Sequence, residues 1–403
     1  MDAQALYDLS PLARLMLLGV VIALGPLAWV WLRHRDAHPA RRLQALTLLT
    51  LFLTFDLVLF GAFTRLTDSG LGCPDWPGCY GSASPLGARE QISAAQSALP
   101  SGPVTHGKAW IEMVHRYLAT GVGVLILTMT LVSWRLYFKQ RAQSPMAAGT
   151  AALHPGWPTL TLVWVCLQGA FGALTVTMKL FPAIVTLHLL GGMVLLVLLC
   201  AQAMRHAQAA GALRTPVGAL LRRGLWLGAV VLACQIALGG WVSTNYAVLA
   251  CSEFPMCQRS WWPAMDFAQG FEIWRPLGQT GAGEHIGFAA LTAIHMAHRV
   301  FALLAFAVLL ALALALRTHA PLRPQAHALL ALCALQLATG LSNVVLGWPL
   351  LAAVLHTGGA AAMALVLTWA LCASCRAQPQ HHAASDADAR RSVQPRAAQE
   401  ARA

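Results

Sequence analysis

Residues 111–116 read IEMVHR and residues 294–299 read IHMAHR, so a His-Arg pair recurs in two apolar segments of one chain. Further matches flank these segments in the same order along the sequence. They are GAFTRLTDSGLGCPDWPGC at 61–79 with GGWVSTNYAVLACSEFPMC at 239–257, and VTLHLLGG at 185–192 with AVLHTGGA at 353–360. Ordered self-similarity of this kind indicates an internal duplication. The chain is therefore predicted to contain two related halves.

The composition is that of a membrane protein. The chain has 403 residues, of which 58% are hydrophobic and 10% are charged, and its mean hydropathy is +0.61. About 20 apolar residues form a helix that can cross a hydrocarbon layer of roughly 30 Å. Runs of this length lie at about residues 12–32, 44–64, 109–133, 159–178, 183–204, 224–245, 288–316, 326–345 and 350–372. We therefore expect an all-α membrane protein with nine spanning helices.

The duplication groups these helices into two pseudo-symmetric four-helix transmembrane bundles plus one extra N-terminal helix. A bundle of four antiparallel helices can hold a cofactor in its core. A tail rich in Ala, Arg, Gln and Asp follows the last helix, and we expect it to be disordered. The predicted divisions are 1–43 for the extra helix and a basic loop, 44–204 for the N-terminal bundle, 205–223 for a linker, 224–372 for the C-terminal bundle and 373–403 for the tail.

The charge distribution predicts the topology. The net charge is +12, but the basic residues occupy alternate loops and form no single patch, which argues against a nucleic-acid partner. Cytoplasmic loops carry an excess of Lys and Arg, so the N-terminus is predicted to be periplasmic and the C-terminus cytoplasmic. The first 30 residues lack the Arg- and Ser-rich pattern of a transit peptide, which favours a bacterial inner membrane.

Four histidines recur at matching positions of the two halves, namely His115 with His298 and His188 with His356. Each lies six to ten residues inside a predicted helix, at a depth on the order of 10 Å. A single histidine at this depth is most simply explained by a hydrogen bond to a neighbouring helix. Its repetition favours a functional site, and two facing imidazoles can ligate a haem iron. Zinc or copper normally needs more ligands than these pairs supply.

Small and basic residues near the histidines have two interpretations each. Gly191 and Gly192 follow the second histidine of the first half, and Gly358 and Gly359 follow that of the second half. Both pairs could leave room for a flat macrocycle or allow close helix packing. Arg299, like Arg116 in the first half, could bind haem propionates or extend to lipid headgroups. The sequence leaves both pairs of alternatives open.

Glu112 distinguishes the two halves. It lies three residues before His115, so both side chains project from one helix face, whereas the aligned position of the second half is His295. A carboxylate at one of two similar sites suggests that the first half is reactive. The alternative is that Glu112 only forms a hydrogen bond with His115.

Each of the two long outer loops contains a cysteine pair, and the members of each pair are six residues apart. An oxidising periplasm favours disulfides, although connectivity cannot be read from a sequence. A simple loop staple is the preferred interpretation of the second pair, and redox participation is left open for the first. The pairs are Cys73 with Cys79 and Cys251 with Cys257.

The run RLTDSGLGCPDWPGC at 65–79, the E-x-x-H-R at 112–116, the His-Arg at 298–299 and the histidines 188 and 356 resemble the haem A synthases. The resemblance covers residues 44 to about 372. It implies two four-helix bundles and oxidation of the C8 methyl of haem O to a formyl group, which gives the haem A of cytochrome oxidase.

The resemblance also implies roles for individual residues. His298 and His356 would ligate a haem b cofactor, with Arg299 beside it. His115 and His188 would face the substrate haem O, and Glu112 would assist its oxidation. The chain departs from the family pattern by its extra N-terminal helix, expected to affect only topology, and by His295, which leaves open which imidazole of that helix is the ligand.

Other functions compete with this interpretation: a bis-histidine electron-transfer cytochrome b, a haem carrier without catalysis, and a thiol oxidoreductase that uses Cys73 and Cys79. An electron-transfer cytochrome would usually hold haems at two depths, whereas these four histidines share one. The expected partners are membrane lipid and, by resemblance, haem O synthase and cytochrome oxidase assembly factors. Formation of a homo-oligomer is left open.

Overall fold

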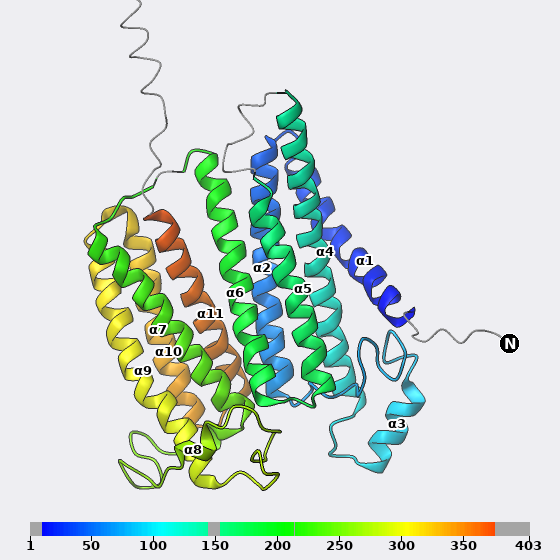
Figure 1. The fold of residues 1–403 in the computed structure, drawn as a ribbon, viewed down its shortest axis with the longest axis vertical. Coiled ribbons are helices and arrows are strands. Elements are labelled where there is room, and N and C mark those ends of the chain that lie inside the picture. The colour runs from blue at the N-terminus through cyan, green and yellow to red at the C-terminus, as the bar shows by residue number, and fades with distance from the viewer. Residues whose placement is uncertain (1–9, 144–153, 213, 375–403) are drawn as a thin grey trace, which may run out of the picture.

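The computed structural model describes residues 10–143, 154–212 and 214–374, and the predicted tail lies almost wholly outside these residues. Long helices run side by side along the molecule (Figure 1). The helices are α1 (Ser10–Arg33), α2 (Pro39–Leu66), α3 (Arg89–Ala98), α4 (His106–Gln143), α5 (Gly156–Thr177), α6 (Pro182–Ala209), α7 (Ala219–Thr244), α8 (Phe267–Gly270), α9 (Phe288–Arg317), α10 (Arg323–Val345) and α11 (Leu350–Ala373), with short 3-10 turns η2 (Ala247–Ala250) and η3 (Ala320–Leu322).

Nine helices of the described residues are long and apolar enough to cross a membrane, which confirms the predicted multi-pass all-α fold. The prediction missed α3, because its ten residues are too polar and too few to form a span. It also shortened α4, whose last turns continue beyond the apolar run as far as Gln143.

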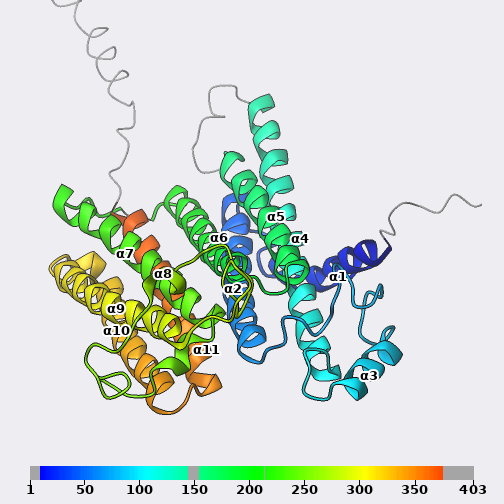
Figure 2. The same cartoon turned by 60° about the horizontal axis from the view of Figure 1, so that its bottom comes forward.

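The eight membrane-length helices that follow α1 form two four-helix bundles that lie side by side in both views (Figures 1 and 2). The first contains α2, α4, α5 and α6, and the second contains α7, α9, α10 and α11. Contacts between the bundles are made by α2 and α6 on one side and by α7 and α11 on the other. Met193 and Leu196 of α6 share a buried apolar cluster with Leu232 of α7 and Leu367 of α11. The bundles therefore share a continuous core.

The loops that carry α3 and α8 emerge at the same end of the two bundles, the lower end in Figure 1, which we call the loop end. A polar cluster joins the bundles there. The Arg65 guanidinium donates to the carbonyl oxygen of Ser243 at 2.7 Å and lies 4.2 Å from the centre of the Tyr246 ring. The Tyr246 hydroxyl donates to Asp68, and burial raises the pKa of Tyr246. This cluster fixes the end of α2 against the end of α7.

The extra helix α1 packs along the outside of α4. The approach is close because a Cβ atom at Gly121 would lie 3.0 Å from the side chain of Ile22. Leu15, near the start of α1, shares a buried cluster with Cys73 and Cys79. The expectation that this helix affects only topology is therefore too narrow, because α1 also supports a loop of the first bundle.

Candidate functional site

The first disulfide loop, which we define as residues 67–88, folds back onto the start of α4. Cys73 and Cys79 form a disulfide with an S–S distance of 2.12 Å, and both are fully buried. A Cβ atom at Gly72 would collide with the backbone of Lys108 and lie 2.6 Å from the backbone nitrogen of Ala109, so only glycine allows this approach. The loop is thereby held within reach of the next turn of α4.

Glu112 contacts this loop directly. Its carboxylate accepts a hydrogen bond from the backbone N–H of Cys73 at 2.8 Å and pairs with Arg116, four residues along α4. The residue is 4% exposed. The hydrogen bonds of its carboxylate therefore go to the loop and to Arg116, and the suggested hydrogen bond to His115 is not formed in this structure.

Arg116 completes the attachment of the loop. Besides Glu112, its guanidinium donates to the carbonyl oxygens of Asp75 at 3.0 Å and Pro77 at 3.2 Å, and to that of Gly78. Charge-assisted hydrogen bonds of this type are stronger than neutral ones. Glu112 and Arg116 therefore act as one unit that fastens the first disulfide loop to α4.

The second half repeats this attachment with a histidine in place of the carboxylate. Cys251 and Cys257 form a disulfide with an S–S distance of 2.02 Å. Arg299 donates to the carbonyl oxygens of Met256 and Cys251, each at 3.2 Å, and its Nε donates to His295 Nε2 at 3.2 Å. Arg299 thus fastens its loop as Arg116 does, and a contact between Arg299 and a propionate stays a prediction.

His295 is engaged through both ring nitrogens. Nδ1 lies 3.0 Å from the carbonyl oxygen of Ala247, and Nε2 accepts from Arg299. The residue is 3% exposed. An imidazole with both nitrogens committed has no electron pair left for a metal, which favours His298 as the ligand from this helix.

We expect Arg116→Ala to destabilise the protein more than Arg299→Ala. Removing Arg116 leaves the Glu112 carboxylate buried without a counter-charge, a change that typically costs about 3–5 kcal/mol. Removing Arg299 leaves a neutral His295 and should cost about 1–3 kcal/mol for unpaired polar groups. Thermal unfolding of the two purified variants in the same detergent measures both losses of stability. Equal losses of stability would show that the Glu112–Arg116 charge pair has no special weight.

The histidines of the first half lie in pockets made by small residues. A Cβ atom at Gly61 of α2 would lie 3.0 Å from His115 Nε2, and one at Gly172 of α5 would lie 3.5 Å from His188 Cε1. Phe60 stacks on His115 with ring centres 6.3 Å apart. His115 of α4 and His188 of α6 lie on helices that both pack against α2 and α5, so the structure places both histidines in one bundle.

The second half has the same arrangement. A Cβ atom at Gly239 of α7 would lie 3.1 Å from His298 Cε1, and one at Gly340 of α10 would lie 3.2 Å from His356 Cε1. His298 of α9 and His356 of α11 lie on helices that both pack against α7 and α10. Each half therefore has two imidazoles inside its bundle, and each of them lies against a glycine of a neighbouring helix.

These residues fit a haem better than a zinc or copper ion. Within the described residues, no group of three or more His, Cys, Asp and Glu side chains is arranged to hold a metal ion. Pairs of imidazoles are the ligand set that haem iron accepts from opposite sides. The buried Nδ1 of His188 has no hydrogen-bond partner among the described residues, so the polarity of this ring is not satisfied by the fold alone.

The glycines that contact the histidines were not singled out from the sequence. Gly191 and Gly359 instead pack against the amide groups of Gln168 and Gln336, so close helix packing explains them. The signal that could have revealed Gly172 and Gly340 is a further repeat, LQGAFG at 167–172 with LQLATG at 335–340. Its short length within an apolar run conceals it.

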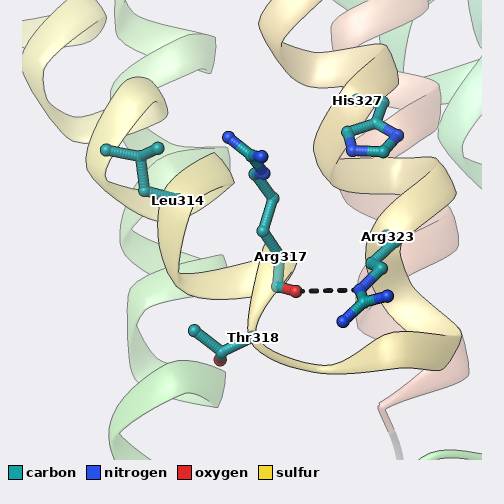
Figure 3. Close-up of a pocket in the computed structure, with 5 residues that line it drawn as sticks. All are labelled: Leu314, Arg317, Thr318, Arg323 and His327. Atoms are coloured by element: carbon teal, nitrogen blue, oxygen red, sulfur yellow. Dashed lines mark hydrogen bonds between the residues drawn. The ribbon is translucent and has the colours of Figure 1, made fainter.

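A depression of about 450 Å³ lies at the far end of α9 from His298 (Figure 3). Its lining includes Arg323, whose Nε donates to the Arg317 carbonyl oxygen at 3.3 Å. None of the predicted site residues lines it, so it is separate from the histidine pairs. The lining residues are Leu314, Arg317, Thr318, Arg323 and His327.

Comparison with known proteins gives one consistent family. A family model described as a cytochrome oxidase assembly protein matches residues 44–368. The chain is 39% identical to a haem A synthase of Shewanella oneidensis over 322 residues, which are 79% of this chain and 92% of that protein. It is 27% identical to a haem A synthase of Rhizorhabdus wittichii over 83% of this chain and 96% of that protein. It is 26% identical to one of Halalkalibacterium halodurans over 74% and 86%.

Proposed function

This chain belongs to the haem A synthase family and oxidises haem O to haem A, and on this basis we propose that its C-terminal bundle holds a haem b cofactor while its N-terminal bundle binds the substrate. His298 and His356 would ligate haem b, and His115 and His188 would face haem O. The observation that carries this assignment is Glu112, since only the first half has a carboxylate one turn from its histidine.

Haem b would supply a one-electron carrier beside the reacting bundle. The protein's own residues supply the rest of the site. Converting a methyl group into a formyl group takes up one oxygen atom, which water can supply, and releases four electrons and four protons. Removal of electrons builds positive charge at the reacting carbon, and this charge has to be balanced. The Glu112 carboxylate, held by the Cys73 N–H and Arg116, is a negative charge preorganised for that purpose.

The loops contribute shielding and rigidity. The disulfide of Cys73 and Cys79 fixes the segment whose N–H orients Glu112, so we propose a positioning role for this pair. The disulfide of Cys251 and Cys257 is proposed as a staple of the corresponding loop. A redox role for either pair would require the disulfide to open during the reaction.

We further propose a bacterial inner-membrane location with the loop end in the periplasm, because the basic residues gather in the loops at the opposite end. Haem O synthase and cytochrome oxidase assembly factors are the proposed partners, because the family model that matches this chain is described as a cytochrome oxidase assembly protein. The proposed domain limits remain 44–204 and 224–372. The helices run slightly beyond them, since α2 begins at Pro39, α6 ends at Ala209, α7 begins at Ala219 and α11 ends at Ala373.

The assignment is tested by purifying the protein from cells that make haem b but no haem O. We expect a bound b-type pigment with a low-spin bis-histidine spectrum, because the cofactor site should fill independently of the substrate site. Addition of haem O should then bring a second haem per chain and, with an electron acceptor, haem A. A protein that binds no haem b until haem O is supplied would contradict the division of roles between the bundles.

A further inference from the structure

The two histidine pairs differ in the groups that hold their rings. In the second half, Thr339 of α10 places its hydroxyl oxygen 2.9 Å from His356 Nδ1. The same hydroxyl donates its proton to the Leu335 carbonyl oxygen at 2.8 Å. A threonine hydroxyl has a single proton, so towards the ring its oxygen can only accept. Nδ1 of His356 therefore carries the proton, and Nε2 keeps its electron pair.

The other ring of this half has a comparable partner. The side-chain amide nitrogen of Gln235, on α7, lies 3.1 Å from His298 Nδ1. The amide oxygen of Gln235 is buried and has no partner among the described residues. The same amide nitrogen lies 3.4 Å from His298 Nε2 and donates to the His298 carbonyl oxygen at 3.3 Å. The ring of His298 is thereby held by a polar group, as the ring of His356 is.

The first half has apolar residues at both corresponding places. Gln168 and Gln336 occupy equivalent positions, because each packs against a glycine of the next helix. Three residues after each glutamine, the first half has Phe171 and the second half has Thr339. Gly61 and Gly239 are equivalent in the same way, because they lie beside His115 and His298. Four residues before each glycine, the first half has Leu57 and the second half has Gln235. Neither phenyl nor isobutyl groups can accept a hydrogen bond, in agreement with the unpartnered Nδ1 of His188.

We propose that Thr339 and Gln235 are positioning residues, of which Thr339 holds His356 in the ligating tautomer and Gln235 fixes the ring of His298, and that Leu57 and Phe171 leave the first pair without such support. A hydrogen bond from the distal N–H of a ligating histidine fixes its orientation and raises its basicity. The second half thus retains its haem, whereas the first half binds a haem that has to leave as product. This inference rests on the proposed assignment of haem b to the second half.

The test uses Thr339→Val, which keeps the shape of the side chain and removes the acceptor. In the purified full-length protein, we expect haem b to transfer to an excess of a haem-scavenging apoprotein roughly tenfold faster than in the wild type. The midpoint potential of the b-type haem should rise, because a less basic imidazole stabilises the ferric state less. Thr339→Ser keeps the hydroxyl and should restore both values.

Thr368→Val is the matched control, since the Thr368 hydroxyl donates only to the Ala364 carbonyl oxygen of its own helix, α11, in the same bundle. If Thr339→Val and this control have the same rate of haem transfer and the same midpoint potential, the proposed positioning role is wrong. Gln235→Leu, which copies the first half, gives the same test if Thr339→Val does not fold. His356→Ala separates a failure of the positioning inference from a failure of the haem b assignment on which it rests. Retention of the bis-histidine spectrum in that variant would overturn the haem b assignment itself.

Discussion

Glu112→Gln stops the formation of haem A while the b-type pigment stays in place: this is the expected result for cells that make haem O and carry the variant. The amide can still accept from the Cys73 N–H but has no negative charge, so charge at the reacting carbon is no longer balanced. Loss of one preorganised electrostatic group typically lowers a rate by about 10² to 10³, and we expect a fall of roughly 100-fold or more. Extraction of the pigments and mass analysis measures the ratio of haem A to haem O.

A carboxylate of the first disulfide loop, Asp75, provides the control for this prediction. Asp75 accepts hydrogen bonds from the backbone N–H groups of Tyr80 and Gly81, so Asp75→Asn disturbs the first disulfide loop without removing the charge beside His115. Haem A should still form in this variant. If Glu112→Gln is active and only Glu112→Ala is inactive, Glu112 acts through loop attachment, and the proposed electrostatic role is wrong.

His356→Ala and His188→Ala are expected to have opposite effects on the bound pigments. Without His356 the second half offers one imidazole, so we expect the purified protein to lose almost all of its haem b and, with it, the conversion of haem O. Without His188 the haem b content should match that of the wild type, but conversion should fail. The measurement is haem b per polypeptide by absorbance of the pyridine complex, beside the extracted haem A.

His327→Ala is the control for these variants, because His327 lines the depression at the far end of α9 from His298 and lies near the start of α10, whereas Gly340, which contacts His356, lies near its end. It should leave haem b content and conversion unchanged. The opposite pattern, with haem b lost in His188→Ala and kept in His356→Ala, would exchange the roles of the two bundles.

The arrangement of helices could be predicted from the sequence because lipid imposes a simple rule. A chain segment inside the hydrocarbon layer has to satisfy its own backbone hydrogen bonds, so apolar runs of sufficient length become helices. The ordered repeat then determined how they group, and the structure agrees. The short helix α3 escaped prediction because it lies in a polar loop, where this rule does not apply.

The site was predicted only in part, because side-chain partners across helices leave no periodic trace. The histidine pairs could be found since each residue recurs at the same place in both halves. The contacts of Arg116 with the carbonyl oxygens of residues 75, 77 and 78 depend on how the loop folds back, which no local pattern records. Thr339 and Gln235 were hidden for another reason: they mark a difference between the halves, and a search for repeats selects what the halves share.

Each disulfide joins cysteines only six residues apart, within the loop that follows a single helix. Neither bond therefore has to wait for a distant part of the chain to be synthesised. The first loop can close before the ribosome has reached the second half, and an error in one pairing does not trap cysteines of the other. Maturation of the two halves can thus proceed in the order of translation, and only the packing of α2 and α6 against α7 and α11 depends on the complete polypeptide.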